Sequence, residues 1–236
     1  MRARPAAQAG VSHPRTPVGY LRTENGGNDL RIIETEACVA EGAAWLAAAD
    51  PRLAAALAVT GPLPLRRRAG GFAALLDAIV SQQVSVASAR AIGGRLAAAG
   101  FDDPQRVAAA DEDDLRACGL SRPKVRYLRA LAGAEIDYAA LAGLPDDAVV
   151  ARLTALPGIG RWTAEIYAMF ALGRADAFAA GDLALQEAAR MLYGLAARPG
   201  ERELRALAEG WRPWRAVAAR LLWAYYRVEK GREGVS

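Results

Sequence analysis

The chain has 236 residues, a formal net charge of +4 and 53% hydrophobic residues, which is enough apolar material for one large domain or two small lobes. Its most apolar runs, such as residues 54–59 and 168–172, are too short to cross a bilayer. The one histidine, His13, lies in an N-terminal tail, and the two cysteines, Cys38 and Cys118, cannot ligate a four-cysteine cluster. These counts exclude histidine-based zinc sites and Ser–His triads. Any chemistry must therefore rest on carboxylates, lysine, hydroxyl groups or backbone.

Arginine supplies all of the 30 basic residues except Lys124 and Lys230. Guanidinium groups match phosphate oxygens in bidentate geometry and stack on bases, so this bias suits a nucleic-acid partner. A GC-rich coding sequence would also raise Arg, Ala and Gly. On composition alone this plainer explanation is the better one.

The first 29 residues form a segment that we expect to lie outside the fold. They are rich in Arg, Pro and Gly, lack hydrophobic periodicity, and contain no acidic residue before Glu24. A transit peptide, an over-long translation start and a disordered arm all fit this composition. We expect residues 30–236 to form one helical domain of two lobes.

From residue 30 onward, apolar residues recur at helical spacing. The predicted helices cover residues 37–49, 72–80, 86–98, 125–132, 148–153, 162–172, 183–193, 203–208 and 214–228. Capping residues mark helix starts and glycines mark helix ends: Asp103, Asp111 and Ser121, and Gly100, Gly119 and Gly194. No strand pair is evident. The sequence predicts an all-α fold with two helical lobes around a cleft.

The string LPGIGRWTA at residues 156–164 predicts a tight turn between two helices. Gly158 and Gly160 permit the turn and leave no side chain between the backbone and a ligand. Their N–H groups, with those of the first helical turn that follows, would then face an anion. The helix dipole adds about 0.3–1 kcal/mol, so one phosphate contact anchors DNA without reading its sequence. An ordinary helix–helix turn is the alternative.

The whole nine-residue string resembles the helix-hairpin-helix of the HhH-GPD DNA glycosylase superfamily. The resemblance implies a hairpin that binds DNA phosphates, with these residues: Pro157, Gly158, Ile159, Gly160, Arg161 and Thr163. It also implies a catalytic aspartate on the loop after the second hairpin helix. Asp182 has that place, just before the predicted helix 183–193. The family usually has proline in this loop, where this chain has alanines.

Asp182 also has a plainer explanation, since an aspartate before a helix is a good N-cap. The two roles are compatible. The competing acids are Asp176, which comes too early in the loop, and Glu187, which we expect on the solvated face of its helix.

Three further strings resemble the alkylbase branch of this superfamily, the DNA-3-methyladenine glycosylase II group. They are GGF at 70–72, IVSQQVSVA at 79–87 and WRPWR at 211–215. The resemblance implies base flipping and hydrolysis of the N-glycosidic bond of alkylated bases such as 3-methyladenine, in base excision repair. Bifunctional members place a Schiff-base lysine where this chain has Trp162, so we expect a monofunctional enzyme without lyase activity.

The same resemblance assigns Gln83, with Gln82 beside it, to the wedge that fills the gap left by a flipped base. It assigns the base pocket to five residues: Trp162, Trp223, Ile166, Tyr167 and Leu183. From the residues alone, the two glutamines could equally be a polar helix end. Each aromatic residue could equally be core, and for Trp211 and Trp214 we expect core packing.

The expected partner is double-stranded DNA with damaged bases, bound by a monomer without a membrane. We expect a cytoplasmic protein associated with the bacterial nucleoid. No cofactor is needed, and the family resemblance implies at most Na⁺ or K⁺ on the carbonyls of the hairpin turn. Two rival functions remain: a non-catalytic helix-hairpin-helix DNA-binding module, and a glycosylase for deaminated or oxidised bases.

Overall fold

The computed structural model describes residues 20–21 and 30–233. Within this part of the chain nearly every element is helical, which confirms the all-α prediction. No helix among the described residues is long and apolar enough to cross a membrane. The expectation that no strands would pair was wrong at one point: β1 (Tyr20–Leu21) pairs antiparallel with β2 (Leu30–Arg31). Two residues per strand are too few to show an alternating pattern. The rest of the predicted tail lies outside the described residues.

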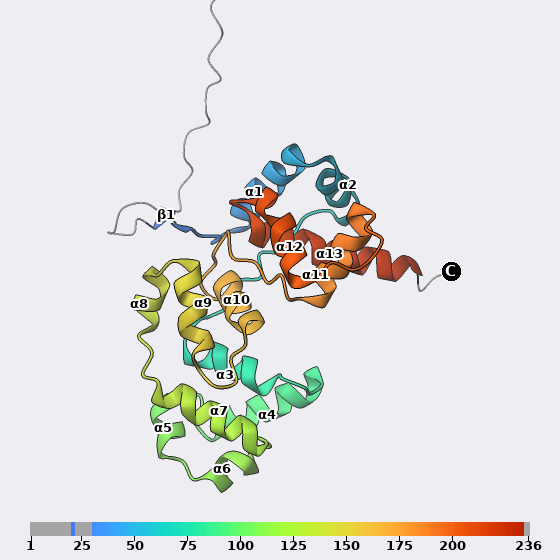
Figure 1. Ribbon diagram of the computed structural model, residues 1–236. Helices are drawn as coiled ribbons and strands as arrows, with labels where there is room; N and C mark the ends of the chain where they lie inside the picture. The colour runs from blue at the N-terminus through green and yellow to red at the C-terminus, as the bar shows by residue number, and fades with distance from the viewer. Residues whose placement is uncertain (1–19, 22–29, 234–236) are drawn as a thin grey trace, which may run out of the picture.

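The helices form two lobes, as the sequence predicted (Figure 1). One lobe, in the lower half of the figure, comes from the middle of the chain. Its helices are α3 (Phe72–Val80), α4 (Val86–Ala98), α5 (Pro104–Ala109), α6 (Glu112–Ala117), α7 (Arg122–Gly133), α8 (Tyr138–Gly143), α9 (Asp146–Thr154) and α10 (Arg161–Phe170). We call this the middle lobe.

The other lobe joins the two ends of the described chain, and we call it the terminal lobe (Figure 1). Its elements are α1 (Glu36–Ala49), α2 (Pro51–Thr60), α11 (Leu183–Tyr193), α12 (Glu201–Leu207), the 3-10 helix η1 (Ala208–Trp211) and α13 (Arg215–Glu233). Helix α13 packs against α1, α2 and α11. Trp211 and Trp214 are buried in this lobe, so the prediction that they are core is confirmed.

Local capping explains where the helices begin and end. The Asp103 carboxylate accepts a hydrogen bond from the Gln105 N–H at 2.8 Å and so caps α5. Gly194 ends α11 in the left-handed region with φ of 62°. Helices α2 and α8 were not predicted, because α2 follows α1 after a single residue and α8 has only six residues.

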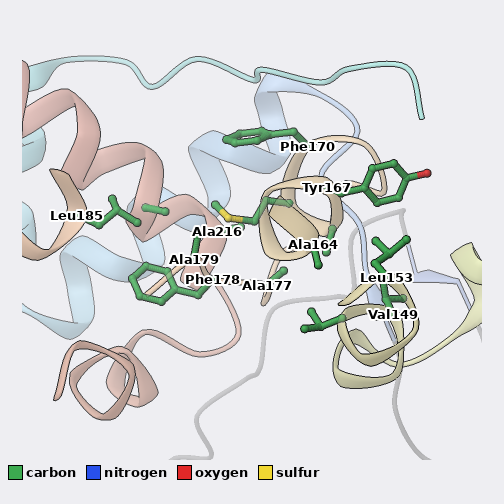
Figure 2. Close-up of a cluster of buried hydrophobic side chains, with 14 of the residues drawn as sticks. Val149, Leu153, Ala164, Tyr167, Phe170, Ala177, Phe178, Ala179, Leu185 and Ala216 are labelled. Carbon is green, nitrogen blue, oxygen red and sulfur yellow. The ribbon is translucent and has the colours of Figure 1, made fainter. Parts of the chain in front are cut away.

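The loop at residues 171–182 passes from α10 to α11 and so connects the lobes. Four of its alanines are fully or almost fully buried: Ala175, Ala177, Ala179 and Ala180. In Figure 2, Ala177, Phe178 and Ala179 lie between Leu185 and Ala216 on one side and the residues of α9 and α10 on the other. The Ala216 N–H donates to the Ala175 carbonyl at 2.9 Å. Small side chains therefore let this loop pack tightly where the family usually has proline.

Candidate active site

The predicted hairpin forms between α9 and α10. Gly158 has φ of 84°, and a Cβ there would overlap the ring of Tyr127. At Gly160 φ is −81°, and a Cβ would meet no atom within 4 Å. Within the described part of the chain, the N–H groups of these two glycines donate no hydrogen bond. The turn therefore presents open backbone N–H groups beside the positive end of α10.

The side chains of the hairpin divide into an exposed and a buried set. Pro157, Gly160 and Arg161 are exposed, whereas Ile159 packs into the core and Thr163 is 7% exposed. Ile159 and Thr163 were predicted to contact phosphate, but both side chains are buried and the Ile159 N–H donates to the Leu156 carbonyl at 3.2 Å. Of these two residues, only Thr163 keeps a backbone N–H for that role. Ile159 is buried because its side chain anchors the turn in the hydrophobic core.

Arg161 connects the hairpin to the terminal lobe. Its Nε donates to Glu165 Oε1 at 3.0 Å, and Arg205 Nη2 of α12 donates to the same oxygen at 2.8 Å. Glu165 is 3% exposed. Burial raises the pKa of Glu165, and the two guanidinium groups partly offset this rise. The carboxylate thus sits between two arginines from different lobes and holds the hairpin helix against α12.

Asp182 is held by four N–H donors. Its Oδ1 accepts from the backbone N–H groups of Ala184 and Leu185 at 2.9 and 3.0 Å, which confirms that it caps α11. Trp162 Nε1 donates to Oδ2 at 3.0 Å and Trp223 Nε1 donates to Oδ1 at 3.2 Å. Among the described residues Asp182 forms no ion pair. The carboxylate is therefore oriented from several sides while its negative charge is left unneutralised.

A cavity of about 590 Å³ lies between α3 and α10, and Asp182 is not among the residues that line it. Trp162, Ile166 and Tyr167 line it, so three of the five predicted pocket residues come together. Tyr167 is 5% exposed, and its hydroxyl accepts from the Gly71 N–H at 3.0 Å. That hydroxyl points away from the buried cluster in Figure 2. Because Trp162 both lines the cavity and binds Asp182, the indole joins the cavity to the carboxylate.

The other two predicted pocket residues lie outside the cavity lining. Leu183 is 62% exposed at the start of α11. Trp223 packs against Phe170, with 5.8 Å between ring centroids, and Phe170 lines the cavity. Trp223 thus reaches the site through Asp182 and Phe170.

The two glutamines predicted as the wedge have different surroundings. Gln83 is exposed in the turn between α3 and α4, with φ of 56°. Gln82 is half-buried, lines the cavity, and its Nε2 donates to the Gly158 carbonyl at 2.8 Å. Gln83 is therefore free to enter a duplex, whereas Gln82 is bound to the hairpin.

The competing acids are engaged elsewhere. Asp176 pairs with Arg215, with Nε and Oδ1 2.8 Å apart. Glu187 pairs with Arg190 at 2.8 Å, and the hydrogen bond from Arg190 lowers the pKa of Glu187. Its side chain is 21% exposed, and Glu187 is not among the buried residues of α11.

Two residues that the sequence did not single out also belong to the site. Asp77 of α3 lines the cavity, and its carboxylate has no hydrogen-bonding or charged partner among the described residues. The guanidinium of Arg66 lies 5.8 Å from the centroid of the Trp223 ring, near Arg68 and Arg227. In the sequence, the run of three arginines at 66–68 could have pointed to Arg66. The helical spacing of residues 74–81 could have shown that Asp77 shares a helix face with the other cavity residues of α3.

The described residues contain no group of three or more His, Cys, Asp or Glu that could hold a metal ion. At the hairpin, the Leu156 carbonyl accepts from the Ile159 N–H at 3.2 Å and the Gly158 carbonyl accepts from Gln82. Each carbonyl keeps a second lone pair. These carbonyls therefore keep acceptor capacity, and a monovalent cation bound to them stays a prediction.

Comparison with known proteins agrees with this geometry. The chain is 32% identical over 158 residues to DNA-3-methyladenine glycosylase 1 of Schizosaccharomyces pombe, and the match covers 63% of this chain and 69% of the relative. It is 32% identical over 160 residues to DNA-3-methyladenine glycosylase 2 of Escherichia coli, covering 62% of this chain and 54% of that protein.

Solved structures show the same fold. The crystal structure of a DNA-3-methyladenine glycosidase from Bacillus halodurans has a TM-score of 0.73 and 30% identity, covering 90% of this chain and 94% of that chain. A 3-methyladenine DNA glycosylase of Schizosaccharomyces pombe in complex with abasic DNA has a TM-score of 0.67 and 26% identity, covering 80% and 97%. The family pattern matches residues 76–213, and the chain therefore belongs to the HhH-GPD superfamily of base excision DNA repair proteins.

Proposed function

We propose that this protein is a monofunctional DNA glycosylase that hydrolyses the N-glycosidic bond of alkylated bases, 3-methyladenine among them, in duplex DNA. The observation that carries the proposal is the unneutralised Asp182 carboxylate, joined through the Trp162 indole to a cavity large enough for a base. The names of the relatives support the choice of alkylated bases.

The hairpin and the arginines around the site bind the DNA backbone in this proposal. The open N–H groups of Gly158 and Gly160 suit one phosphate, and the complex of the S. pombe relative with abasic DNA supports DNA as the partner. Arg66 lies near Arg68 and Arg227. Burial lowers the pKa of Arg66, and the like charges of Arg227 and Arg68 lower it further. A DNA backbone would relieve this repulsion.

The cavity offers a cationic base two kinds of attraction. The indole of Trp162 is electron-rich, and its face attracts a cation with a free energy of about 0.5–2 kcal/mol. Asp77 adds a carboxylate without a partner among the described residues. Extrusion of the nucleotide costs a few kcal/mol, and damaged bases cost least because their pairing or stacking is weaker. Gln83, exposed in its turn, is placed to fill the gap.

Asp182 assists the bond cleavage. The C1′–N bond breaks with its electron pair leaving on the base, which neutralises the positive charge of the alkylated purine. Positive charge then develops on the sugar, and the ionised Asp182 stabilises it. A water molecule attacks C1′ and loses its proton to the carboxylate or to solvent.

A Schiff-base route has no lysine in the site. Lys124 is buried against the carbonyls of Val80 and Gln82, and Lys230 lies 6.0 Å from the Tyr226 ring near the end of α13. The sugar therefore stays unattached to the protein, and the backbone is not cut.

The test is release of free bases from methylated duplex DNA, followed by chromatography, with strand nicking and borohydride trapping measured in parallel. We expect 3-methyladenine to be released without nicking and without a trapped adduct. Tight DNA binding with no release of any alkylated base would contradict the proposal, and release from duplexes with deaminated or oxidised bases would then assign another lesion.

A further test addresses the hairpin. Gly160→Asp places a negative side chain at the phosphate and should weaken binding to all DNA sequences alike by ~10-fold. Gly160→Ala is the matched control, because φ is −81° and a Cβ meets no atom within 4 Å. Equal affinity of wild type and Gly160→Asp would remove the hairpin from DNA binding.

A further inference from the structure

Helix α7 carries a buried lysine that contacts the turn between α3 and α4. Lys124 is 9% exposed, and its Nζ donates to the Val80 carbonyl at 2.7 Å and the Gln82 carbonyl at 2.8 Å. Both carbonyls lie at the C-terminal end of α3, where the helix dipole favours a cation. Lys124 forms no ion pair among the described residues. Burial lowers the pKa of Lys124, so its position is costly for a residue with only a packing role.

The same helix also supports the hairpin turn. Tyr127 lies one helical turn after Lys124, and its ring packs directly beneath Gly158. The Gln82 side chain completes the connection, since its Nε2 donates to the Gly158 carbonyl at 2.8 Å. Two turns that are far apart in sequence are therefore bound to α7 and to each other.

The turn held in this way contains an unfavourable backbone conformation. Gln83 has φ of 56°, a region that side chains other than glycine rarely adopt. The neighbouring peptide carbonyl, that of Gln82, is held by Lys124. Such a conformation persists only where its surroundings impose it. The side chain of Gln83 is exposed in this turn.

We propose that Lys124 and Gln82 are positioning residues that set the separation between the Gln83 turn and the phosphate-binding hairpin. The inference rests on the proposed function. With the two turns held together, the side chain that enters the duplex does so at a set distance from the phosphate held by Gly158 and Gly160. Displacement of either turn would leave DNA binding intact and misplace the flipped nucleotide relative to Asp182.

The test uses Lys124→Met, which keeps an unbranched buried side chain and removes the amine. In single-turnover reactions with a duplex that carries one 7-methylguanine, we expect base release to fall by ~10- to 100-fold, as misplacement of a reacting group by about 1 Å does. DNA affinity should change by less than about twofold, because the hairpin itself is intact. Arg126→Met, which removes an exposed charge from the same helix, is the matched control.

Flipping can be measured apart from excision. In an Asp182→Asn background, 2-aminopurine beside the lesion should brighten when saturating protein unstacks the duplex. Lys124→Met should abolish most of this rise, and Arg126→Met should retain it. Gln82→Met, which keeps the lysine, should act in the same direction and serves if Lys124→Met does not fold.

Unchanged base release and an unchanged fluorescence rise in folded Lys124→Met or Gln82→Met would overturn the inference. A large loss of DNA affinity in both would also overturn it, because it would assign these residues to binding and not to positioning. Failure of the wild type to release any base would instead contradict the proposed function.

Discussion

The loop at residues 171–182 carries a carboxylate near its middle and another at its end, and their partners differ. Asp176 is bound by Arg215, with Nε to Oδ1 at 2.8 Å and Nη2 to Oδ2 at 3.0 Å, and Arg212 lies 3.4 Å away. Asp182 is bound by two indole and two backbone N–H groups. Both side chains are half-buried, so burial alone does not distinguish them.

The difference teaches what a half-buried carboxylate can do. A bidentate guanidinium neutralises Asp176 and ties the loop to the start of α13, so its contribution is to stability. Neutral donors orient Asp182 and leave its charge available to a positive charge that develops nearby. The proposed catalytic acid and the structural acid therefore differ in their hydrogen-bond donors.

The largest expected effect is that of Asp182→Asn. Asparagine can still cap α11 through its carbonyl oxygen, so the fold should be retained. It carries no charge to stabilise the sugar cation, and we expect base release to fall by ~10³-fold or more, beyond the loss of a single neutral donor. Circular dichroism and DNA affinity should stay near those of the wild type. Retained excision would remove Asp182 from the chemistry.

Trp223→Phe tests the donors around Asp182. It keeps a ring beside Phe170 but removes the N–H that donates to Oδ1. A hydrogen bond to a charged group is worth about 1.5 kcal/mol, so base release should fall ~10-fold. Trp211→Phe, which loses an indole N–H bound to the Tyr193 hydroxyl, is the matched control. Equal losses in the two variants would mean that the effect is not specific to the carboxylate.

Asp176→Asn should have the opposite pattern. Loss of its charged hydrogen bonds should lower the free energy of unfolding by about 1–3 kcal/mol, or the melting temperature by ~2–10 °C. Base release per folded molecule should stay within about twofold, because no charge near the cavity changes. Thermal denaturation and active-site titration measure the two effects. A loss of catalysis without a loss of stability would reverse the roles of Asp176 and Asp182.

The smallest expected effect concerns Asp77. Its carboxylate is exposed and lines the cavity, so Asp77→Asn should lower the preference for cationic over neutral lesions by ~2- to 5-fold at low salt. The difference should shrink at high salt, where exposed charges are screened. Competition between 7-methylguanine and hypoxanthine duplexes measures it. An unchanged preference at low salt would leave Asp77 without a role in selectivity.

Local sequence signals predicted the elements that carry the site better than the contacts between them. Helices 72–80, 86–98 and 183–193 have the predicted bounds because periodicity and caps mark them. The predicted capping role of Asp182 is confirmed for the same reason. Its catalytic role is a prediction that came from the family resemblance.

Contacts between residues far apart in the chain produce no pattern in the local sequence. The bond from Lys124 to the Val80 carbonyl spans 44 residues and that from Gln82 to Gly158 spans 76. Periodicity reads only neighbouring turns, so neither bond could be anticipated. The burial of Thr163 was missed for the same reason. The pairing of β1 with β2 was missed because two residues per strand are too few to show an alternating pattern.

The most direct measurement is single-turnover release of 3-methyladenine by wild type, Asp182→Asn and Asp176→Asn at saturating protein, each corrected for its folded fraction. We expect the wild type and Asp176→Asn to release the base at rates within about twofold, and Asp182→Asn to be slower by ~10³-fold. Equal losses in the two variants, or a loss confined to Asp176→Asn, would contradict the assignment of Asp182 as the catalytic carboxylate.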